Sequence, residues 1–483
     1  MQNDNIIVVG CGIAGLSAAV SAAEVGAKVT VLERAPKEER GGNTRWTEAF
    51  MRMKNDEEVS EDFLEHFAEN AGWHLDPSLI NETSRDYSEW PSILKSLSFT
   101  DPELVNTLAT QAGPTLQWLK GYGIKFSDMA TYLLTQNTTR ICPVGGGLAL
   151  VESLALAAEK LGVNFLYETT ASSLVKNEMG EVCGITVRRK NNQTEIHNGK
   201  IILASGGFEG NSEMQTRYFG ERARFVRPVA RGGYYNRGEG IKMALDVGAA
   251  TAGDFSEYHA QPIDPRSGVS EPIVFNFPYG VLVDVKGQRF IDEASDSVDA
   301  IYENVARTIN SLPQGMAYLI CDQNLERVDN WKRSVRSDKD PFVANNLKEL
   351  SSLISVPSEQ LIKSIDEFNA ATSTGLFDPF KLDGLSTKGI YPPKSNWALP
   401  ISEPPFRAWP ISSANCFTFG GIRCNSNAEI LDGDGRPISN IYAAGETMGL
   451  YYKRYTGATS VLRGAVFGRI AGRHASGANA IVN

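Results

Sequence analysis

Three features that would each define a class of protein are missing from this 483-residue sequence. No uninterrupted apolar run reaches the roughly 18 residues of a membrane-spanning helix, so we predict no transmembrane segment. The six cysteines are scattered, form no CxxC pair and stand at no metal-ligand spacing with a histidine, so we predict no metal site. The N-terminus is polar and lacks the apolar core of a secretory signal, which indicates a cytoplasmic protein.

Basic residues are also in short supply. The chain has 47 Lys and Arg against 57 Asp and Glu, which gives a net charge of −10. This balance disfavours a nucleic-acid-binding surface, although a local basic pocket for a small anion remains compatible with it. The length exceeds the roughly 250–300 residues that one hydrophobic core usually serves, so we expect two domains.

What the sequence does contain is a glycine motif at its start. Residues 5–34 read NIIVVGCGIAGLSAAVSAAEVGAKVTVLER, which predicts a strand, a glycine turn, a helix, a second strand and an acid. Gly10 permits the sharp turn, Gly12 lets backbone N–H groups approach a pyrophosphate, and Gly15 lets the helix pack closely on the sheet. Glu33 can accept both ribose hydroxyl protons. The predicted dinucleotide contacts here are Gly10, Gly12, Ile13, Ala14, Gly15, Glu33 and Arg34.

Three further segments favour FAD over NAD. The GGNT stretch at 41–44 suits the middle of an extended cofactor, and the apolar strand that begins at residue 200 ends in close-approach glycines. Glu446 can bind ribityl hydroxyls, and a helix predicted to start at Ser460 can stabilise negative charge on reduced flavin. No second glycine motif with a trailing acid is present, which argues against a nicotinamide co-substrate. The predicted contacts of these segments are Gly41, Gly42, Asn43, Thr44, Ala171, Ala204, Ser205, Gly206, Gly445, Glu446, Ser460, Val461 and Leu462.

The order of these signals predicts an α/β protein with a discontinuous Rossmann-like FAD-binding domain and an inserted α+β capping domain. Composition shifts near residue 253 and the first type of signal returns after residue 395. We therefore divide the chain into 1–253, the first part of the FAD-binding domain; 254–395, the capping domain; and 396–483, the second part. Expected elements include a mainly helical stretch at 55–135, a hairpin at 171–176 and 182–189, and a last helix at 460–475.

Taken together, these motifs resemble the FAD-dependent fumarate reductase and succinate dehydrogenase flavoprotein family over nearly the whole chain. The matching pieces are GCGIAG, GGNT, LASGGFEGN, NRGEGIKMALDVGA, GQRFIDE, IYAAGE and VFGRIAGR. Within the family the chain is most similar to the tricarballylate dehydrogenase-like and 3-ketosteroid dehydrogenase-like branch, through GGNTRW, PYGVLVDVKGQRFIDE and RGAVFGRIAG. The resemblance implies an FAD oxidoreductase that acts on CH–CH bonds.

The chain departs from the fumarate reductases where they hold substrate. Ser297 stands near the position of their proton-donating arginine, and Cys416 and Phe417 precede the TFGG segment where they have a histidine. No histidine follows GGNT to bind flavin covalently, so we expect non-covalent FAD. We therefore predict that hydrogen is removed from a substrate. A fumarate reductase-like ene-reductase, a 3-ketosteroid dehydrogenase and a flavin-binding protein without catalysis remain alternatives.

Removal of hydrogen beside a carboxyl or ketone needs a base and a group that holds the substrate. Arginine pairs bidentately with carboxylate, and aromatic walls suit a ring-bearing substrate. A packing role is the alternative for each tyrosine, a structural hydrogen bond for the histidine, and a solvated surface position for each arginine. The predicted catalytic residues are Tyr455, Tyr279, His259 and Tyr452, and the predicted substrate-binding residues are Arg454, Arg231, Phe417 and Gly457. We expect a small-molecule substrate that is either an oxo-acid, cyclic or open-chain, or a polycarboxylate. The expected electron acceptor is oxygen, a quinone or a carrier protein.

Overall fold

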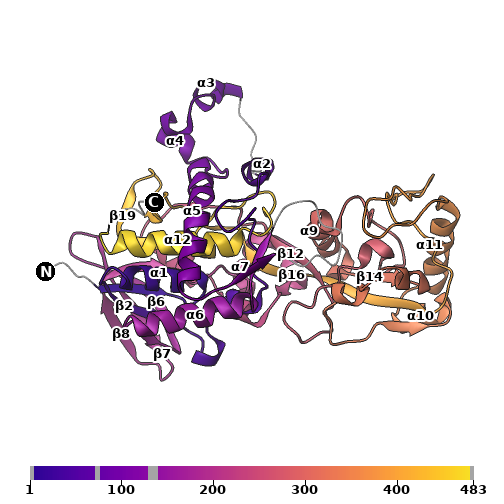
Figure 1. The fold of residues 1–483 in the computed structure, drawn as a ribbon, viewed down its shortest axis with the longest axis horizontal. Helices are drawn as coiled ribbons and strands as arrows, with labels where there is room; N and C mark the ends of the chain where they lie inside the picture. Colours follow the sequence, from indigo (N-terminus) through magenta and orange to yellow (C-terminus); the bar gives the residue numbers. More distant parts are fainter. Residues whose placement is uncertain (1–4, 71–76, 129–139, 479–483) are drawn as a thin grey trace.

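The computed structural model describes residues 5–70, 77–128 and 140–478, and it shows a larger and a smaller body (Figure 1). The larger body is built on a six-stranded sheet with the order β18-β19-β9-β1-β2-β5. Five of its strands run parallel, and β18 pairs antiparallel with β19 at one edge. The strands are β1 (Asn5–Val9), β2 (Lys28–Leu32), β5 (Asn164–Leu166), β9 (Lys200–Leu203), β18 (Glu429–Leu431) and β19 (Pro437–Ala443).

Helices pack on this sheet through small residues. The last helix, α12 (Ser460–Ala475), has the predicted bounds and lies against α1 (Ile13–Ala23). A Cβ at Gly468 would lie 2.2 Å from the carbonyl oxygen of Ala14, so only glycine permits this approach. The other long helices of this body are α5 (Pro102–Gly121) and α6 (Gly146–Lys160).

The predicted hairpin is confirmed and gains a third strand. β6 (Thr169–Lys176) pairs antiparallel with β7 (Val182–Arg189), and β7 pairs with β8 (Thr194–Asn198). Residues 194–198 include a single apolar side chain, the exposed Ile196, so the segment lacks the apolar run that predicted the neighbouring strands.

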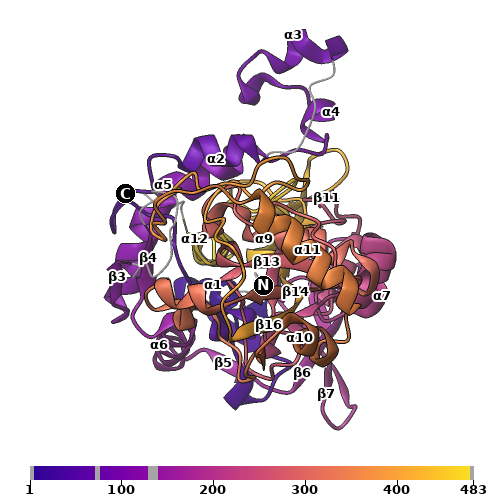
Figure 2. The same cartoon turned by 90° about the vertical axis from the view of Figure 1, so that its right-hand side faces the viewer.

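Residues 71–76 and 129–135 of the stretch expected to be helical at 55–135 lie outside the described residues, and the described remainder is helical only in part. It contains α2 (Phe63–Glu69), α5 and two single-turn helices, α3 (Ile80–Thr83) and α4 (Ser92–Lys95). The segment with α3 and α4 projects away from the rest of the larger body in both views (Figures 1 and 2). Shorter elements in the larger body are β3 (Phe126–Asp128), β4 (Ile141–Pro143), α7 (Ser212–Phe219), α8 (Glu239–Asp246), β11 (Thr251–Ala252) and β17 (Gly421–Ile422).

The smaller body, which we call the cap, is a small sheet covered by helices. Figure 2 shows α10 and α11 on the side of the cap that faces the viewer, and Figure 1 shows α9 on the side nearer the larger body. The amphipathic pattern of α9 buries its apolar face against this sheet, with Val305 and Ile309 fully buried. The cap elements are β13 (Val281–Asp284), α9 (Val298–Asn310), β14 (Met316–Cys321), β15 (Phe342–Ala344), α10 (Leu347–Leu353) and α11 (Ser358–Ala371).

One long strand joins the two bodies. β16 (Phe406–Thr418) pairs near its start with β14 and β15, and near its end with β12 (Tyr258–Ile263) and β10 (Arg227–Pro228). The expected division between 395 and 396 therefore falls before a strand whose first half completes the cap sheet. Its far end carries Cys416 and Phe417 to the candidate site.

Candidate active site

A cavity of about 760 Å³ runs from the carboxyl ends of β1, β2 and β9 to the cap. This is where open α/β sheets bind their ligands. The residues predicted from sequence that line it are Gly10, Gly12, Ile13, Ala14, Glu33, Arg34, Gly41, Gly42, Asn43, Thr44, Ala171, Ala204, Ser205, Gly206, His259, Phe417, Gly445, Glu446, Arg454, Tyr455, Gly457, Ser460 and Val461.

The first end of the cavity is the glycine turn. Gly10 has φ +106°, and a Cβ there would lie 2.3 Å from the carbonyl oxygen of Ala204. Helix α1 begins directly after Gly12, so the N-terminus of the helix faces the cavity, where the backbone N–H of Ile13 donates to Thr44 Oγ1 (3.1 Å). A Cβ at Gly15 would lie 2.0 Å from the carbonyl oxygen of Gly10. Gly15 is therefore a support beneath the turn and does not line the cavity.

Glu33 stands where an adenosine ribose would be held. Its Oε2 accepts a hydrogen bond from the backbone N–H of Cys11 (3.0 Å), and its Oε1 accepts one from that of Ala35 (2.8 Å). The side chain is buried, and burial raises its pKa. The two backbone hydrogen bonds fix the carboxyl at the end of β2, with further lone pairs for ribose hydroxyls.

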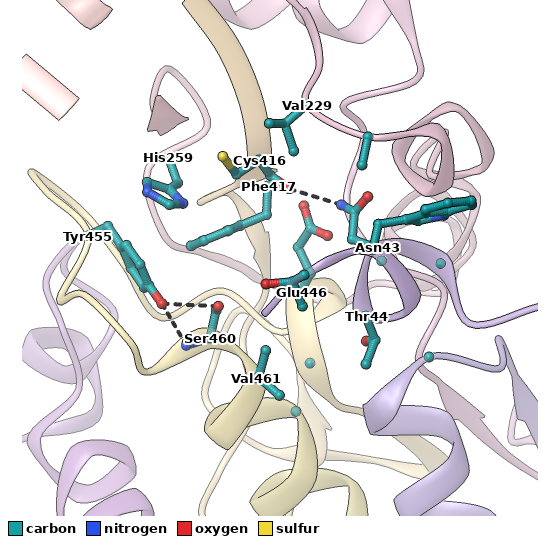
Figure 3. A pocket seen from close by; sticks show the side chains of 18 of the residues that line it. Asn43, Thr44, Val229, His259, Cys416, Phe417, Glu446, Tyr455, Ser460 and Val461 are labelled. Carbon is teal, nitrogen blue, oxygen red and sulfur yellow. Dashed lines mark hydrogen bonds between the residues drawn. The ribbon is translucent and has the colours of Figure 1, made fainter. Parts of the chain in front are cut away.

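Two carboxyl groups, Glu209 and Glu446, are linked through Asn236 next to the cavity (Figure 3 labels Glu446). Glu446 lines the cavity and is half-buried, whereas Glu209 is buried behind the lining residues. Glu446 Oε1 accepts hydrogen bonds from the backbone N–H (2.6 Å) and Oγ1 (3.1 Å) of Thr418. Glu209 Oε1 accepts them from the Nδ2 groups of Asn43 (2.5 Å) and Asn236 (2.6 Å). Asn236 Nδ2 also lies 3.5 Å from Glu446 Oε2, so it connects the two acids.

Burial raises the pKa of both carboxyl groups. The pKa of Glu209 is raised further because the negative charge of Glu446 opposes its ionisation. We infer that the pair holds one proton, which sits on Glu209. Sequence reasoning found Glu446 but missed Glu209 and Asn236, whose only signals are the acid in GGFEGN and the amide in NRGEG.

Replacing Glu209 by glutamine is expected to flatten the pH dependence of stability. In the wild type, the folded state binds this proton more tightly than the unfolded chain, so stability falls as pH rises above the ordinary carboxyl pKa towards the raised one. Glutamine imitates the protonated acid at every pH. In thermal unfolding of the apoprotein from pH 5 to pH 8, the melting temperature of the variant should increase relative to that of the wild type as pH rises. A constant difference in melting temperature would contradict the shared proton.

Tyr455 reaches the N-terminus of α12 from the loop before it (Figure 3). Its hydroxyl accepts hydrogen bonds from the backbone N–H groups of Thr459 (2.9 Å) and Ser460 (3.0 Å), and it donates to Ser460 Oγ (3.0 Å). Val461 follows on the cavity wall, whereas Leu462 is fully buried inside the larger body. The phenol oxygen thus occupies a place that favours negative charge.

The acid–base candidates gather beside Tyr455. His259 Nε2 lies 2.7 Å from the hydroxyl of Tyr302, and both side chains line the cavity. The His259 ring packs on Tyr455 (4.5 Å between centroids) and Phe417 (5.2 Å). Tyr302 comes from α9 of the cap, so the pair joins the two bodies. Sequence reasoning missed Tyr302 because no local motif marks it.

The ordinary pKa of a histidine side chain is about 6.5. Burial lowers the pKa of His259 to about 3. Burial also raises the pKa of Tyr302 well above its usual range. At neutral pH the resting pair is therefore a neutral imidazole and a neutral phenol. Two carboxyl groups on the cavity wall titrate closer to neutrality, because burial raises the pKa of Glu271 to about 7 and that of Glu303 to about 8.

Cationic side chains line the cavity near Gly457. Arg454, which is exposed, was predicted from sequence. Arg52 and Arg140 were not, because they are far from Gly457 in the chain and belong to no motif. Arg52 is buried and pairs with Asp62 (2.6 Å), and Arg140, whose side chain is 10% exposed, pairs with Asp299 (2.7 Å).

Three of the residues predicted to be catalytic or to bind substrate lie away from the cavity, so their side chains do not reach the place where those roles were expected. Tyr279 donates its hydroxyl hydrogen to the carbonyl of Pro379 (2.8 Å) within the cap. Tyr452 lines a separate hollow of about 130 Å³. Arg231 is exposed and pairs with Glu39 (2.5 Å). Each sits next to a sequence feature of the site, but its own side chain points elsewhere.

The site residues fit FAD. Ser205 Oγ and Asn43 Oδ1 are buried polar atoms on the cavity wall with no hydrogen-bond partner among the described residues, so both call for a ligand. At Gly445 a Cβ would lie 2.7 Å from that of Ala14, so the cradle tolerates no side chain there. Within the described part of the chain, no three His, Cys, Asp or Glu side chains gather to hold a metal ion.

The fold and the cavity define a dinucleotide-binding oxidoreductase with a cap. The chain belongs to the family described as FAD binding domain, whose model matches residues 5–462. None of the helices in the described residues is long and apolar enough to cross a membrane.

Proteins named as reductases and proteins named as dehydrogenases are both similar to the chain. Vinyl phenol reductase of Lactiplantibacillus plantarum is 26% identical, over 98% of this chain and 96% of its own. The open conformation of a flavocytochrome c3 fumarate reductase matches with a TM-score of 0.75 at 23% identity, over 99% of this chain and 78% of that one. A 3-ketosteroid delta1-dehydrogenase from Sterolibacterium denitrificans matches with a TM-score of 0.73 at 19% identity, over 98% and 100%. FAD-dependent oxidoreductase chemistry follows from the family, and the expected fold is confirmed.

Proposed function

We propose that the protein is an FAD-dependent dehydrogenase that forms a C=C bond next to a carboxyl or ketone group of a small organic acid. One observation carries this: the cavity continues from the FAD cradle into a chamber that holds both a buried His–Tyr pair and arginine side chains. Relatives named as reductases and dehydrogenases support the CH–CH chemistry in general.

Each step of the proposed reaction is assigned to residues of the cavity. Arg454 pairs with the carboxylate or polarises the oxo group of the substrate. The base is either Tyr455 in its phenolate form or the neutral imidazole of His259 in its pair with Tyr302, and it accepts the proton from the carbon next to that group. The rings of Phe417 and Tyr455 exclude water from the reacting carbons. Bound FAD supplies a two-electron acceptor for the hydride from the neighbouring carbon.

The cofactor is bound without a covalent link in this proposal. Arg45 and Trp46 stand directly after GGNT, and Arg45 is engaged with Glu152 (2.9 Å). Acid precipitation of the holoprotein should therefore release all yellow colour to the supernatant. The electrons leave to oxygen, a quinone or a carrier protein.

Anaerobic bleaching of the flavin tests the proposed direction. We expect one of four saturated probes to reduce the bound flavin: tricarballylate, 4-oxocyclohexanecarboxylate, succinate or a 3-oxosteroid. An ene-reductase would instead leave the oxidised flavin yellow with all four, and its photoreduced flavin would be reoxidised by the matching unsaturated acids. A protein whose flavin responds in neither direction would be a flavin-binding protein without catalysis.

A further inference from the structure

We propose that Arg52 and Arg140 form an anion subsite around Gly457 that binds a second carboxylate of the substrate, remote from the group that activates the reacting carbons. The substrate is then a dicarboxylic or polycarboxylic acid. The identity of the ligand as substrate rests on the proposed function. The arrangement of the two arginines around Gly457 does not depend on that function.

Arg52 is held rigidly at one side of the subsite. Its side chain is only 3% exposed. Its Nε donates to the carbonyl of Gly457 (2.8 Å), and its Nη1 donates to Asp62 (2.6 Å). Its backbone N–H donates to the carbonyl of Ala458 (2.8 Å). No described residue accepts a hydrogen bond from the remaining Nη2 group, which is left for a ligand.

Arg140 lies at the same point of the cavity wall. Its two terminal nitrogens bind both oxygens of Asp299, at 2.9 and 2.7 Å. Asp299 and Tyr302 are three residues apart on α9 and so share one face of that helix. The subsite therefore adjoins the His259–Tyr302 pair, and one small molecule can contact both.

The two guanidinium groups converge on Gly457. A Cβ built there would lie 3.6 Å from Nη2 of Arg52 and 3.6 Å from Nη2 of Arg140. Gly457 lines the cavity, so the point between the two groups is accessible to a ligand. The pKa of Arg52 is lowered by burial and then by the positive charge of Arg140. A carboxylate bound between the two would relieve this repulsion.

The occupant is assigned to the substrate because of where the point lies. It adjoins the acid–base residues, and a carboxylate matches the fork of N–H donors that guanidinium presents. A charged hydrogen bond of this kind contributes about 1.5–3 kcal/mol, which corresponds to roughly 10–100-fold in affinity. The negatively charged reduced flavin is the other anion that the two arginines could bind. The experiment below distinguishes it from a substrate carboxylate.

Gly457→Ala tests the subsite without removing any charge. The new methyl group fills the point between the guanidinium groups, at a backbone conformation that alanine tolerates, since the φ of Gly457 is not positive. The probes are chain-matched pairs, glutarate with pentanoate and succinate with butanoate. Binding to the oxidised holoenzyme is followed by the flavin spectrum or, where a probe reduces the flavin, by the concentration dependence of the reduction rate. Gly121→Ala is the matched control, since no atom lies within 4 Å of its Cβ position.

In the wild type and in Gly121→Ala, each diacid should bind at least tenfold more tightly than its monoacid. In Gly457→Ala, this ratio should fall at least tenfold while the Kd for FAD stays within threefold. Arg52→Lys, which keeps the charge but loses the fork, should lower the ratio at least threefold and serves if Gly457→Ala does not fold. An unchanged ratio in either variant overturns the proposal, as does a changed Kd for FAD without a changed ratio. Failure of the proposed function looks different: no acid bleaches the flavin, yet the ratio is still measurable.

Discussion

Gly15→Ala is expected to yield protein that retains no FAD. The new Cβ would lie 2.0 Å from the carbonyl oxygen of Gly10, where backbone meets backbone and no flexible side chain can yield. Relief of this clash requires α1 to move away from the turn that faces the cofactor. The yellow colour after purification and the Kd for FAD measure the outcome, and we expect the Kd to rise at least about 100-fold.

Two further glycine variants serve as comparisons for Gly15→Ala. Gly121→Ala, at the end of α5, meets no neighbour and should keep its FAD. Gly12→Ala meets its nearest protein atoms at 3.5 Å, an ordinary contact, so its apoprotein should be as stable as the wild type. Its methyl group would still occupy the path of the pyrophosphate and weaken FAD binding. If Gly15→Ala remained yellow with wild-type stability, the close packing of turn and helix would not be what shapes the cradle.

Tyr302→Phe and His259→Gln are expected to slow reduction of the flavin by substrate by about 10²–10⁴-fold, the range of a lost acid–base group. Each removes one partner of the 2.7 Å hydrogen bond that joins the cap to the larger body. FAD affinity should not change. Stopped-flow reduction with α-deuterated substrate measures the effect, because loss of the base makes the α-carbon isotope effect larger.

Tyr279→Phe is the matched control for Tyr302→Phe, because its hydroxyl bonds only a carbonyl inside the cap. The pH profile gives a second check. His259, with a pKa of about 3, should add no inflection between pH 5 and pH 8. Inflections near pH 7 or 8 would belong to Glu271 or Glu303 and disappear in their glutamine variants. An inflection near pH 6.5 that His259→Gln removes would mean that the histidine titrates in the enzyme.

The sequence allowed the cofactor end of the site to be predicted because local spacing determines it. A glycine turn between a strand and a helix, with an acid at the end of the next strand, leaves few alternatives, and Glu33 lies where the spacing placed it. The last helix was predictable for the same reason. Its glycines and alanines recur on the face that packs on α1.

The chamber beside the flavin site could not be predicted in the same way, because its residues meet only through the fold. Tyr302 reaches His259 because α9 of the cap crosses β12, and no periodicity in either segment reveals that crossing. Arg52 and Arg140 come from separate loops and meet at Gly457. Tyr279 was predicted to be catalytic because it precedes a buried strand, as site residues often do. That strand, however, belongs to the core of the cap.

The continuity of β16 has a mechanical consequence. One end of this strand is hydrogen-bonded into the cap through β14, and the other ends at Thr418, whose backbone N–H holds Glu446. The carbonyl of Cys416, two residues earlier, accepts a hydrogen bond from Asn43 (2.9 Å). Because β16 is hydrogen-bonded in both bodies, a displacement of the cap would also displace Cys416 and Thr418 at the far end of the strand. A movement of the cap would therefore reach Glu446 and Asn43 on the cavity wall.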